Sequence, residues 1–164
     1  MALHDDLLEQ ANHLAKRERR KPRQASLRRA VSSAYYAMFH LLLWESTGRT
    51  FGALAARRRF RHSLARGFSH QSMVKVCKSF AATTLPPKIM SFIAPFTVPS
   101  DLQLIAETFV TLQDKRRRAD YNLAAPFHRA EVVAILEAAQ TAFEAWDRVK
   151  PDDAAAFFLA VLPL

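Results

Sequence analysis

The fold is decided by one long apolar stretch, which reads Leu27-Arg28-Arg29-Ala30-Val31-Ser32-Ser33-Ala34-Tyr35-Tyr36-Ala37-Met38-Phe39-His40. Its apolar side chains recur at helical spacing and continue through Leu41, Leu42 and Trp44, which predicts a helix over residues 23–47. A helix with so little polar surface contacts other helices on most of its sides. The sequence therefore predicts that this helix is central to the fold.

The flanking sequence predicts further helices by the same periodicity. We expect them over residues 3–20, 57–82, 101–118 and 126–150, with a short terminal helix after Pro151. No segment has the alternation of a strand. The fold class is therefore predicted to be all-α, an antiparallel bundle of four to five main helices, with residues 1–150 as one domain and residues 151–164 as a short apolar tail.

Helix ends are predicted from capping residues. Gly48 is expected to cap the central helix, and Ser100 or Asp101 to begin the helix that follows. Gly67 and Ser69 are expected to divide residues 57–82 into two helices. Residues 49–56 are expected to form a loop, and residues 91–99 an apolar connector.

The charge of the chain favours a polyanionic partner. The 164 residues carry a formal net charge of +9, and a pI near 10.3 is typical of domains that bind nucleic acid.

The sequence also indicates where the cysteine and the apolar segments lie. Cys77 is the only cysteine, which excludes a disulfide within the chain, and we expect it in the core. No leader or membrane-spanning segment is apparent, so a cytoplasmic location without membrane contact is expected. The apolar residues 154–164 are expected to pack or to mediate oligomer contacts.

A polar stripe runs along the central helix. Arg29, Ser33, Tyr36 and His40 follow one another at spacings of 4, 3 and 4, which places them on one face. This stripe could bind a phosphate or a base, with Arg29 as the cation and His40 as the proton carrier. It could equally be a buried network that connects this helix to a neighbour.

An arginine run ends the helix predicted over residues 101–118. Arg116 and Asp120 are four residues apart and can pair, and Arg117 and Tyr121 form a neighbouring pair. Three consecutive arginines cannot all face a core, so at least one faces solvent or a ligand such as phosphate. The alternative is a solvated charge run. The histidines, including His62 and His70, lack metal-ligand spacing, so neither a metal nor another cofactor is predicted.

Two of these segments together resemble a known family. The stretch from Leu27 to His40 resembles the signature helix of HEPN domains, most closely their branch of small standalone proteins. The segment from Arg116 to Tyr121 resembles the Ala-Asp-Tyr segment of that branch, and residues 69–74 weakly resemble a histidine-containing stretch between them. The resemblance spans about residues 3–148.

The resemblance implies a helical bundle that forms a homodimer. Active HEPN proteins are metal-independent ribonucleases, often toxins or antiviral effectors, whose signature is an arginine followed at short spacing by a histidine. The two copies of this motif meet across the dimer to form one composite site. The arginine would stabilise the charged phosphorane, and the histidine would move the proton of the attacking 2′-hydroxyl. Counted from Arg116, the histidine positions of this chain hold Tyr121, Asn122 and Leu123.

Three hypotheses follow for function. The first is a HEPN-like protein that binds RNA or a nucleotide without the usual catalytic histidine, in a toxin–antitoxin or defence system with a nucleotidyltransferase-like or antitoxin partner. The second is a metal-independent endoribonuclease that uses Arg116 with His40, or with His70 in its place. The third is a structural or protein-interaction module. The candidate binding residues are Arg29, Tyr36, His70, Arg117, Arg118 and Asn122, with Asp120 and Tyr121 as a structural pair.

Overall fold

The protein is helical throughout the residues that the computed structural model describes, which are 2–52, 58–82 and 97–164. These ranges hold seven helices and no strand, so the predicted all-α fold is confirmed. The helices are α1 (Leu3–Lys16), α2 (Gln24–Phe51), α3 (Arg58–Ala65), α4 (His70–Ala81), α6 (Ser100–Tyr121), α7 (Arg129–Val149) and α8 (Asp153–Val161).

Contacts divide the chain into two compact units. Unit 1 comprises residues 1–40 and 108–144, and unit 2 comprises residues 41–107 and 145–164. Helices α2, α6 and α7 each contribute residues to both units. The single domain over residues 1–150 stays a prediction.

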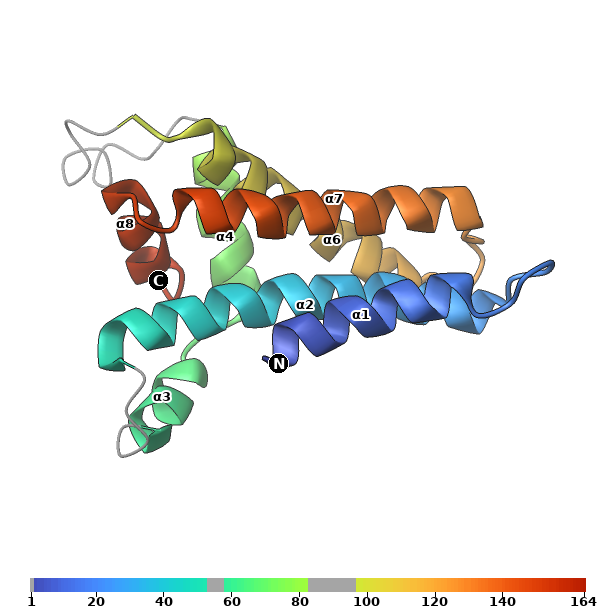
Figure 1. The fold of residues 1–164 in the computed structure, drawn as a ribbon, viewed down its shortest axis with the longest axis horizontal. Coiled ribbons are helices and arrows are strands. Elements are labelled where there is room, and N and C mark those ends of the chain that lie inside the picture. The colour runs from blue at the N-terminus through green and yellow to red at the C-terminus, as the bar shows by residue number, and fades with distance from the viewer. Residues whose placement is uncertain (1, 53–57, 83–96) are drawn as a thin grey trace. The chain divides into compact units, whose positions relative to one another are not determined.

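Unit 1 consists of α1 and the adjoining parts of α2, α6 and α7. Each of these helices runs in the direction opposite to the one before it in this unit (Figure 1). Tyr35 lies fully buried between them, with its ring 5.6 Å from that of Phe109. His4 at the start of α1 lies 6.0 Å from Phe143 on α7, ring to ring. The apolar residues predicted for the central helix, as far as Met38, are thus part of the core of this unit.

The two connections at one end of unit 1 are bonded to each other. The Gln24 amide donates to the carbonyl of Phe127 at 2.8 Å and accepts from its N–H at 2.9 Å. Arg129 also donates to the carbonyls of Glu18 and Arg19. Residues 17–23 and 122–128 are therefore fixed side by side at the same end of unit 1 (Figure 1).

Two predicted helix ends in unit 1 are wrong. α1 ends at Lys16 instead of residue 20, because the Glu18 carboxylate accepts hydrogen bonds from Ser26 Oγ at 2.8 Å and from the Arg23 N–H at 3.3 Å. α7 begins at Arg129 instead of Pro126, because the backbone of Phe127 is bonded to Gln24 and not to a helical partner. Bonds within the connection to α2 thus set the end of α1, whereas a side chain distant in sequence sets the start of α7.

Unit 2 contains the remaining parts of α2, α6 and α7, together with α3, α4 and α8. Phe80 on α4 and Phe158 on α8 meet edge to face at 4.9 Å, and both are buried. Ser46 Oγ donates to the carbonyl of Leu159 at 3.0 Å. Cys77 is fully buried, as predicted, and burial raises the pKa of its thiol.

The apolar C-terminal residues do not form an exposed patch. Phe158, Leu159, Val161 and Leu162 are buried in unit 2, and only Leu164 is largely exposed among the large apolar residues of this segment. The short helix begins as predicted, with the Asp152 carboxylate accepting from the Ala154 N–H at 2.7 Å. The expectation that this tail mediates oligomer contacts loses its basis, because its apolar surface is covered within the chain.

Helix ends in unit 2 are partly as predicted. The break between α3 and α4 falls at Gly67–Ser69, and the Ser69 side chain caps α4 by accepting from the Ser72 N–H at 3.0 Å. Gly48 lies inside α2 and does not cap it. The helix instead ends before Gly52, which has a φ of 67° and donates to the Gly48 carbonyl at 2.7 Å.

The start of α6 also differs from the prediction. The first helical hydrogen bond runs from the Gln103 N–H to the Pro99 carbonyl at 3.0 Å, so neither Ser100 nor Asp101 is the cap. Asp101 instead pairs with Arg148 on α7 at 2.8 Å. The loop predicted at residues 49–56 is wrong for residues 49–51, which belong to α2. Residues 53–56 of that loop and residues 91–96 of the predicted connector lie outside the described residues.

Candidate nucleic-acid interface

Arg116 lies at the centre of a polar network near the end of α6. Its Nε is 2.7 Å from Asp120 Oδ2, and its Nη2 donates to the Tyr36 hydroxyl at 2.8 Å. Ser32 Oγ donates to Asp120 Oδ1 at 2.5 Å. The predicted pair of Arg116 and Asp120 is therefore confirmed, and it connects α6 to α2.

Aromatic rings surround the same guanidinium. Its central carbon lies 5.4 Å from the ring centroid of Tyr36, 5.7 Å from that of Tyr35 and 5.8 Å from that of Tyr121. Burial alone would lower the pKa of Arg116, but Tyr36, Asp120 and Tyr121 outweigh this effect and raise it. Arg116 is thus a fixed cation whose charge is largely engaged by its own neighbours.

Arg118 is engaged by another carboxylate. Its Nη1 lies 2.6 Å from Glu131 Oε1 on α7, which also accepts from Lys115 Nζ at 2.9 Å. The guanidinium lies 4.3 Å from the ring centroid of Phe127 and donates to the Pro126 carbonyl at 2.7 Å. Burial opposes ionisation of Glu131, but hydrogen bonds from Lys115 and Arg118 outweigh it and lower the pKa of this carboxyl.

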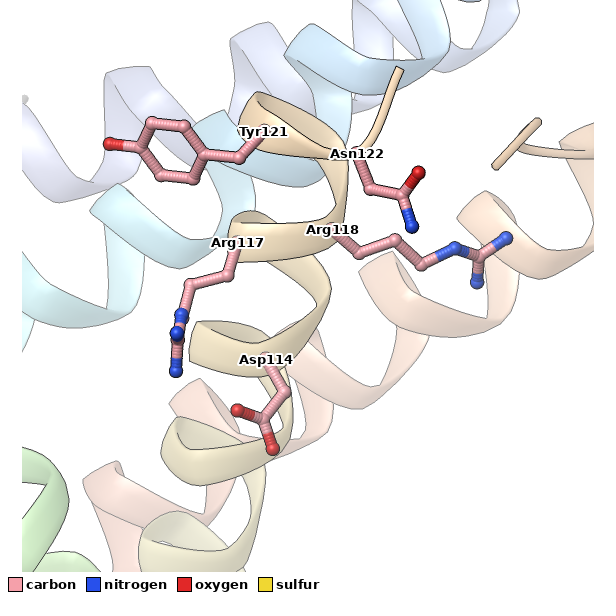
Figure 2. Close-up of a pocket in the computed structure, with 5 residues that line it drawn as sticks. All are labelled: Asp114, Arg117, Arg118, Tyr121 and Asn122. Atoms are coloured by element: carbon pink, nitrogen blue, oxygen red, sulfur yellow. The ribbon is translucent and has the colours of Figure 1, made fainter. Parts of the chain in front are cut away.

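Arg117 differs from both neighbours. Its side chain is exposed and makes no hydrogen bond or ion pair with any residue in the described part of the chain. It lines an open surface pocket of about 600 Å³ together with Asp114, Arg118, Tyr121 and Asn122. Figure 2 shows Arg117 and Tyr121 extending on one side of α6, with Arg118 and Asn122 on the other. Tyr121 is 73% exposed, so a cation and an aromatic ring are both accessible here.

Arg28 holds the turn beside this pocket, a role that the sequence did not reveal. Its guanidinium donates to four carbonyls, those of Ala119, Asn122, Leu123 and Ala125, at 2.8–3.2 Å. The Asn122 side chain accepts from the Ala125 N–H at 3.2 Å in the same turn. The only available signal was an arginine inside an apolar helix, which needs acceptors, but its partners lie more than 90 residues away.

The residues of the polar stripe on α2 do not all contact the same neighbour. Ser33 Oγ donates to Gln10 Oε1 on α1 at 3.1 Å, and Tyr36 accepts from Arg116 on α6. Arg29 is exposed, whereas His40 is half-buried and lies edge to face with Phe39 at 5.5 Å. Ser33 and Tyr36 thus join a network, which confirms that alternative for these two residues. Arg29 faces solvent, and its contact with a phosphate stays a prediction.

The connection between α1 and α2 is the most basic segment of unit 1. Six of the eight residues from Lys16 to Arg23 are Lys or Arg, and Glu18 is the only acidic one. All six cations are exposed, and Glu18 is bonded to Ser26. Arg129 fixes this segment beside residues 122–128. Unit 1 therefore presents exposed cations on a connection that is held in place.

His70 is the one predicted site residue that belongs to unit 2, where it begins α4 and is half-buried. The other predicted residues, which are Arg29, Tyr36, His40, Arg116, Arg117, Arg118, Asp120, Tyr121 and Asn122, all belong to unit 1. No protein-family model, curated protein or solved structure matches the chain.

In the part of the chain that the structure describes, no three side chains of His, Cys, Asp or Glu come together in a way that could hold a metal ion. No described helix combines the length and the apolar character that crossing a membrane requires.

Proposed function

We propose that unit 1 is an RNA-binding module that holds the phosphate backbone and leaves it intact. The observation that carries this proposal is the difference among three consecutive arginines. Arg116 and Arg118 are paired with carboxylates, whereas Arg117 is exposed beside Tyr121 without a carboxylate partner. An unpaired guanidinium in an open pocket is suited to a phosphate, whose geometry its planar fork matches.

The surroundings of Arg117 support a nucleic-acid ligand over a small anion. The exposed ring of Tyr121 offers a surface on which an unpaired base can stack. Arg29 and the six exposed cations between Lys16 and Arg23 add positive charge to the same unit. A chain of phosphates can contact several such cations at once, which a single anion cannot do. The resemblance to HEPN domains favours RNA among the polyanions.

The residues present favour binding over cleavage. Tyr121, Asn122 and Leu123 occupy the positions where HEPN ribonucleases would carry the histidine, and an amide cannot act as a general base near neutral pH. Arg116 is engaged by Asp120 and Tyr36. Its role in this proposal is to position the end of α6, with Tyr36, Asp120 and Arg28.

Fluorescence anisotropy with a labelled single-stranded RNA tests the proposal. We expect Arg117→Ala to weaken binding and to reduce the slope of log K against log salt by about 0.7, the value for one lost phosphate contact on a single strand. Lys78→Ala, which removes an equally exposed cation from α4, is the matched control. An equal loss in both variants would mean that net charge alone drives binding, and an affinity that neither salt nor Arg117→Ala changes would refute the proposal.

A second candidate is a metal-independent endoribonuclease. One observation favours it, because Arg116 bonds to Tyr36 and His40 follows Tyr36 by one turn of α2. We expect metal-free protein to cleave mixed RNA in this case, and a variant with both His40→Ala and Arg116→Ala to lose that cleavage. Cleavage by the variant at the wild-type rate would assign the activity to a contaminant.

The resemblance to HEPN domains also leads to a proposal on how the protein assembles with itself and with other proteins. We propose a homodimer, together with an antitoxin or nucleotidyltransferase-like partner in a defence or toxin–antitoxin system. Leu123 is 86% exposed beside the exposed Tyr121, which supports a protein contact next to the RNA site. Sedimentation velocity tests the homodimer, and Leu123→Asp should shift the protein to monomer. A wild-type monomer at all concentrations would refute this assembly.

A further inference from the structure

A second surface of interest lies in unit 2, where α3 packs against the end of α2. The Arg61 guanidinium lies over the Trp44 ring at 4.0 Å from its centroid, and its Nη2 donates to the Trp44 carbonyl at 3.4 Å. About two turns further along α2, Phe51 stacks on Phe60 of α3 with the ring centroids 5.8 Å apart. Aromatic rings and arginine thus alternate along this contact.

Gly48 makes room for this arrangement. Trp44, Gly48 and Phe51 follow one another at spacings of 4 and 3, so they share one face of α2. A Cβ added at Gly48 would meet Arg61 Nη2 at 3.7 Å, which is van der Waals contact, and a longer side chain would extend into the guanidinium. Glycine at residue 48 therefore leaves space beside Arg61, although a single Cβ would also fit there.

The aromatic side chains of this contact are unusually exposed. Trp44 is 51% exposed and Phe60 is 58% exposed, whereas Trp146 is 1% exposed. Around them, Arg59, His62 and Arg66 of the α3 region are also exposed, and the α3 sequence contains no acidic residue. Large aromatic surface that remains in contact with water is costly unless a partner covers it.

We propose that this surface, defined by Trp44, Phe60 and Arg61, is a second binding site, and that its ligand is single-stranded nucleic acid. Unpaired bases stack on the exposed rings, and Arg59 and Arg61 contact the phosphates. Stacking on aromatic rings within a basic groove is how proteins bind single strands with little sequence preference. The site lies in unit 2 and does not depend on the proposed function of unit 1.

The residues of this surface favour nucleic acid over a membrane surface as its ligand. A membrane-surface helix needs a continuous apolar face, but α3 reads Arg-Arg-Phe-Arg-His-Ser-Leu-Ala, with Phe60 and Leu64 as its only large apolar residues. Stacked Arg61 keeps its full charge, because its partner is a ring and not a carboxylate. A base offers a flat ring and its phosphate offers a negative charge, which together match both components of the surface.

Intrinsic fluorescence of the full chain gives a direct test, because Trp44 and Trp146 are the only tryptophans and only Trp44 is exposed. Acrylamide quenches exposed tryptophans and therefore reports the emission of Trp44. We expect a 12-nucleotide oligouridine to quench this same part of the emission. An abasic sugar–phosphate chain of the same length carries the same charge without bases, and we expect it to quench little. Trp44→Leu should remove this response and weaken oligouridine binding at least about 5-fold, which is the effect of one lost stacking contact at its lower limit.

Two further variants keep the test independent of any folding defect in Trp44→Leu. Arg61→Lys keeps the charge but loses the planar stacking group, so we expect weaker quenching with unchanged circular dichroism. Lys78→Ala, on α4, should leave the quenching as in the wild type. Equal quenching by the abasic chain, or affinity unchanged by both Trp44→Leu and Arg61→Lys, would overturn the proposal. A response to anionic vesicles without one to oligouridine would replace it with membrane-surface binding.

Discussion

Arginine has different surroundings near the end of α6 and in α3. In α6, Arg116 and Arg118 each lie within 2.7 Å of a carboxylate oxygen, and their charges connect helices within unit 1. In α3, Arg61 lies on the Trp44 ring and Arg59 is exposed. A carboxylate neutralises an arginine, whereas an aromatic ring leaves its charge available to a ligand. The same residue type therefore stabilises the fold in one region and forms a candidate binding surface in the other.

The contrast predicts that Arg116 contributes more to stability than Arg61 or Arg117 does. Arg116→Ala should lower the free energy of unfolding by about 2 kcal/mol, because Asp120 and the Tyr36 hydroxyl lose their partner in a partly buried network. Urea denaturation followed by circular dichroism measures this loss. Arg116→Lys should recover only part of it, since an ammonium cannot contact Asp120 and Tyr36 with the same planar fork. A loss below about 0.5 kcal/mol would mean that the network contributes little.

Glu131 is the carboxylate that neutralises Arg118 and Lys115, and we expect Glu131→Gln to cost about 1 kcal/mol at neutral pH. The folded protein lowers the pKa of Glu131 from its ordinary value of 4.5, so its ionised form stabilises the fold. That contribution is complete above pH 4.5 and is lost as the pH falls through the lower folded pKa. The stability difference between the wild type and Glu131→Gln should therefore shrink below pH 4.5.

Unfolding curves of both proteins at several pH values test this prediction. Other carboxylates with lowered pKa values, Glu18 and Asp101, remain in both proteins, so their contributions cancel in the difference. A difference that stays constant from pH 7 to pH 3 would show that the charge of Glu131 has no role in stability.

The sequence predicts the parts of this comparison that depend on local spacing. The helix periodicity around Leu27–His40 gave the fold class, and the spacing of four residues gave the pair of Arg116 and Asp120. The sequence does not predict the hydrogen bonds from Arg28 to four carbonyls or the hydrogen bond from Ser32 to Asp120. These bonds join residues about 90 positions apart. The sequence also missed Trp44 as an exposed residue, because its place in an apolar run predicted burial.

The contact of Arg61 with Trp44 should contribute a smaller amount to stability. Arg61→Ala removes one cation–π contact at a half-exposed site, and we expect a loss of about 0.5–1 kcal/mol. Thermal unfolding of the variant beside the wild type measures the change. A loss as large as that of Arg116→Ala would contradict the contrast, because it would make Arg61 as structural as the carboxylate-paired arginines.

Arg117 should have the smallest effect on stability of all these positions. Its exposed side chain has no ion pair or hydrogen bond within the described part of the chain, so Arg117→Ala should change the free energy of unfolding by less than about 0.5 kcal/mol. The same substitution should weaken RNA binding and its salt dependence, which Arg118→Ala should affect less, because Glu131 already engages that arginine. Parallel unfolding and anisotropy measurements on both variants separate the two roles. A larger loss of stability in Arg117→Ala than in Arg118→Ala would reverse the assignment and make Arg117 a structural residue.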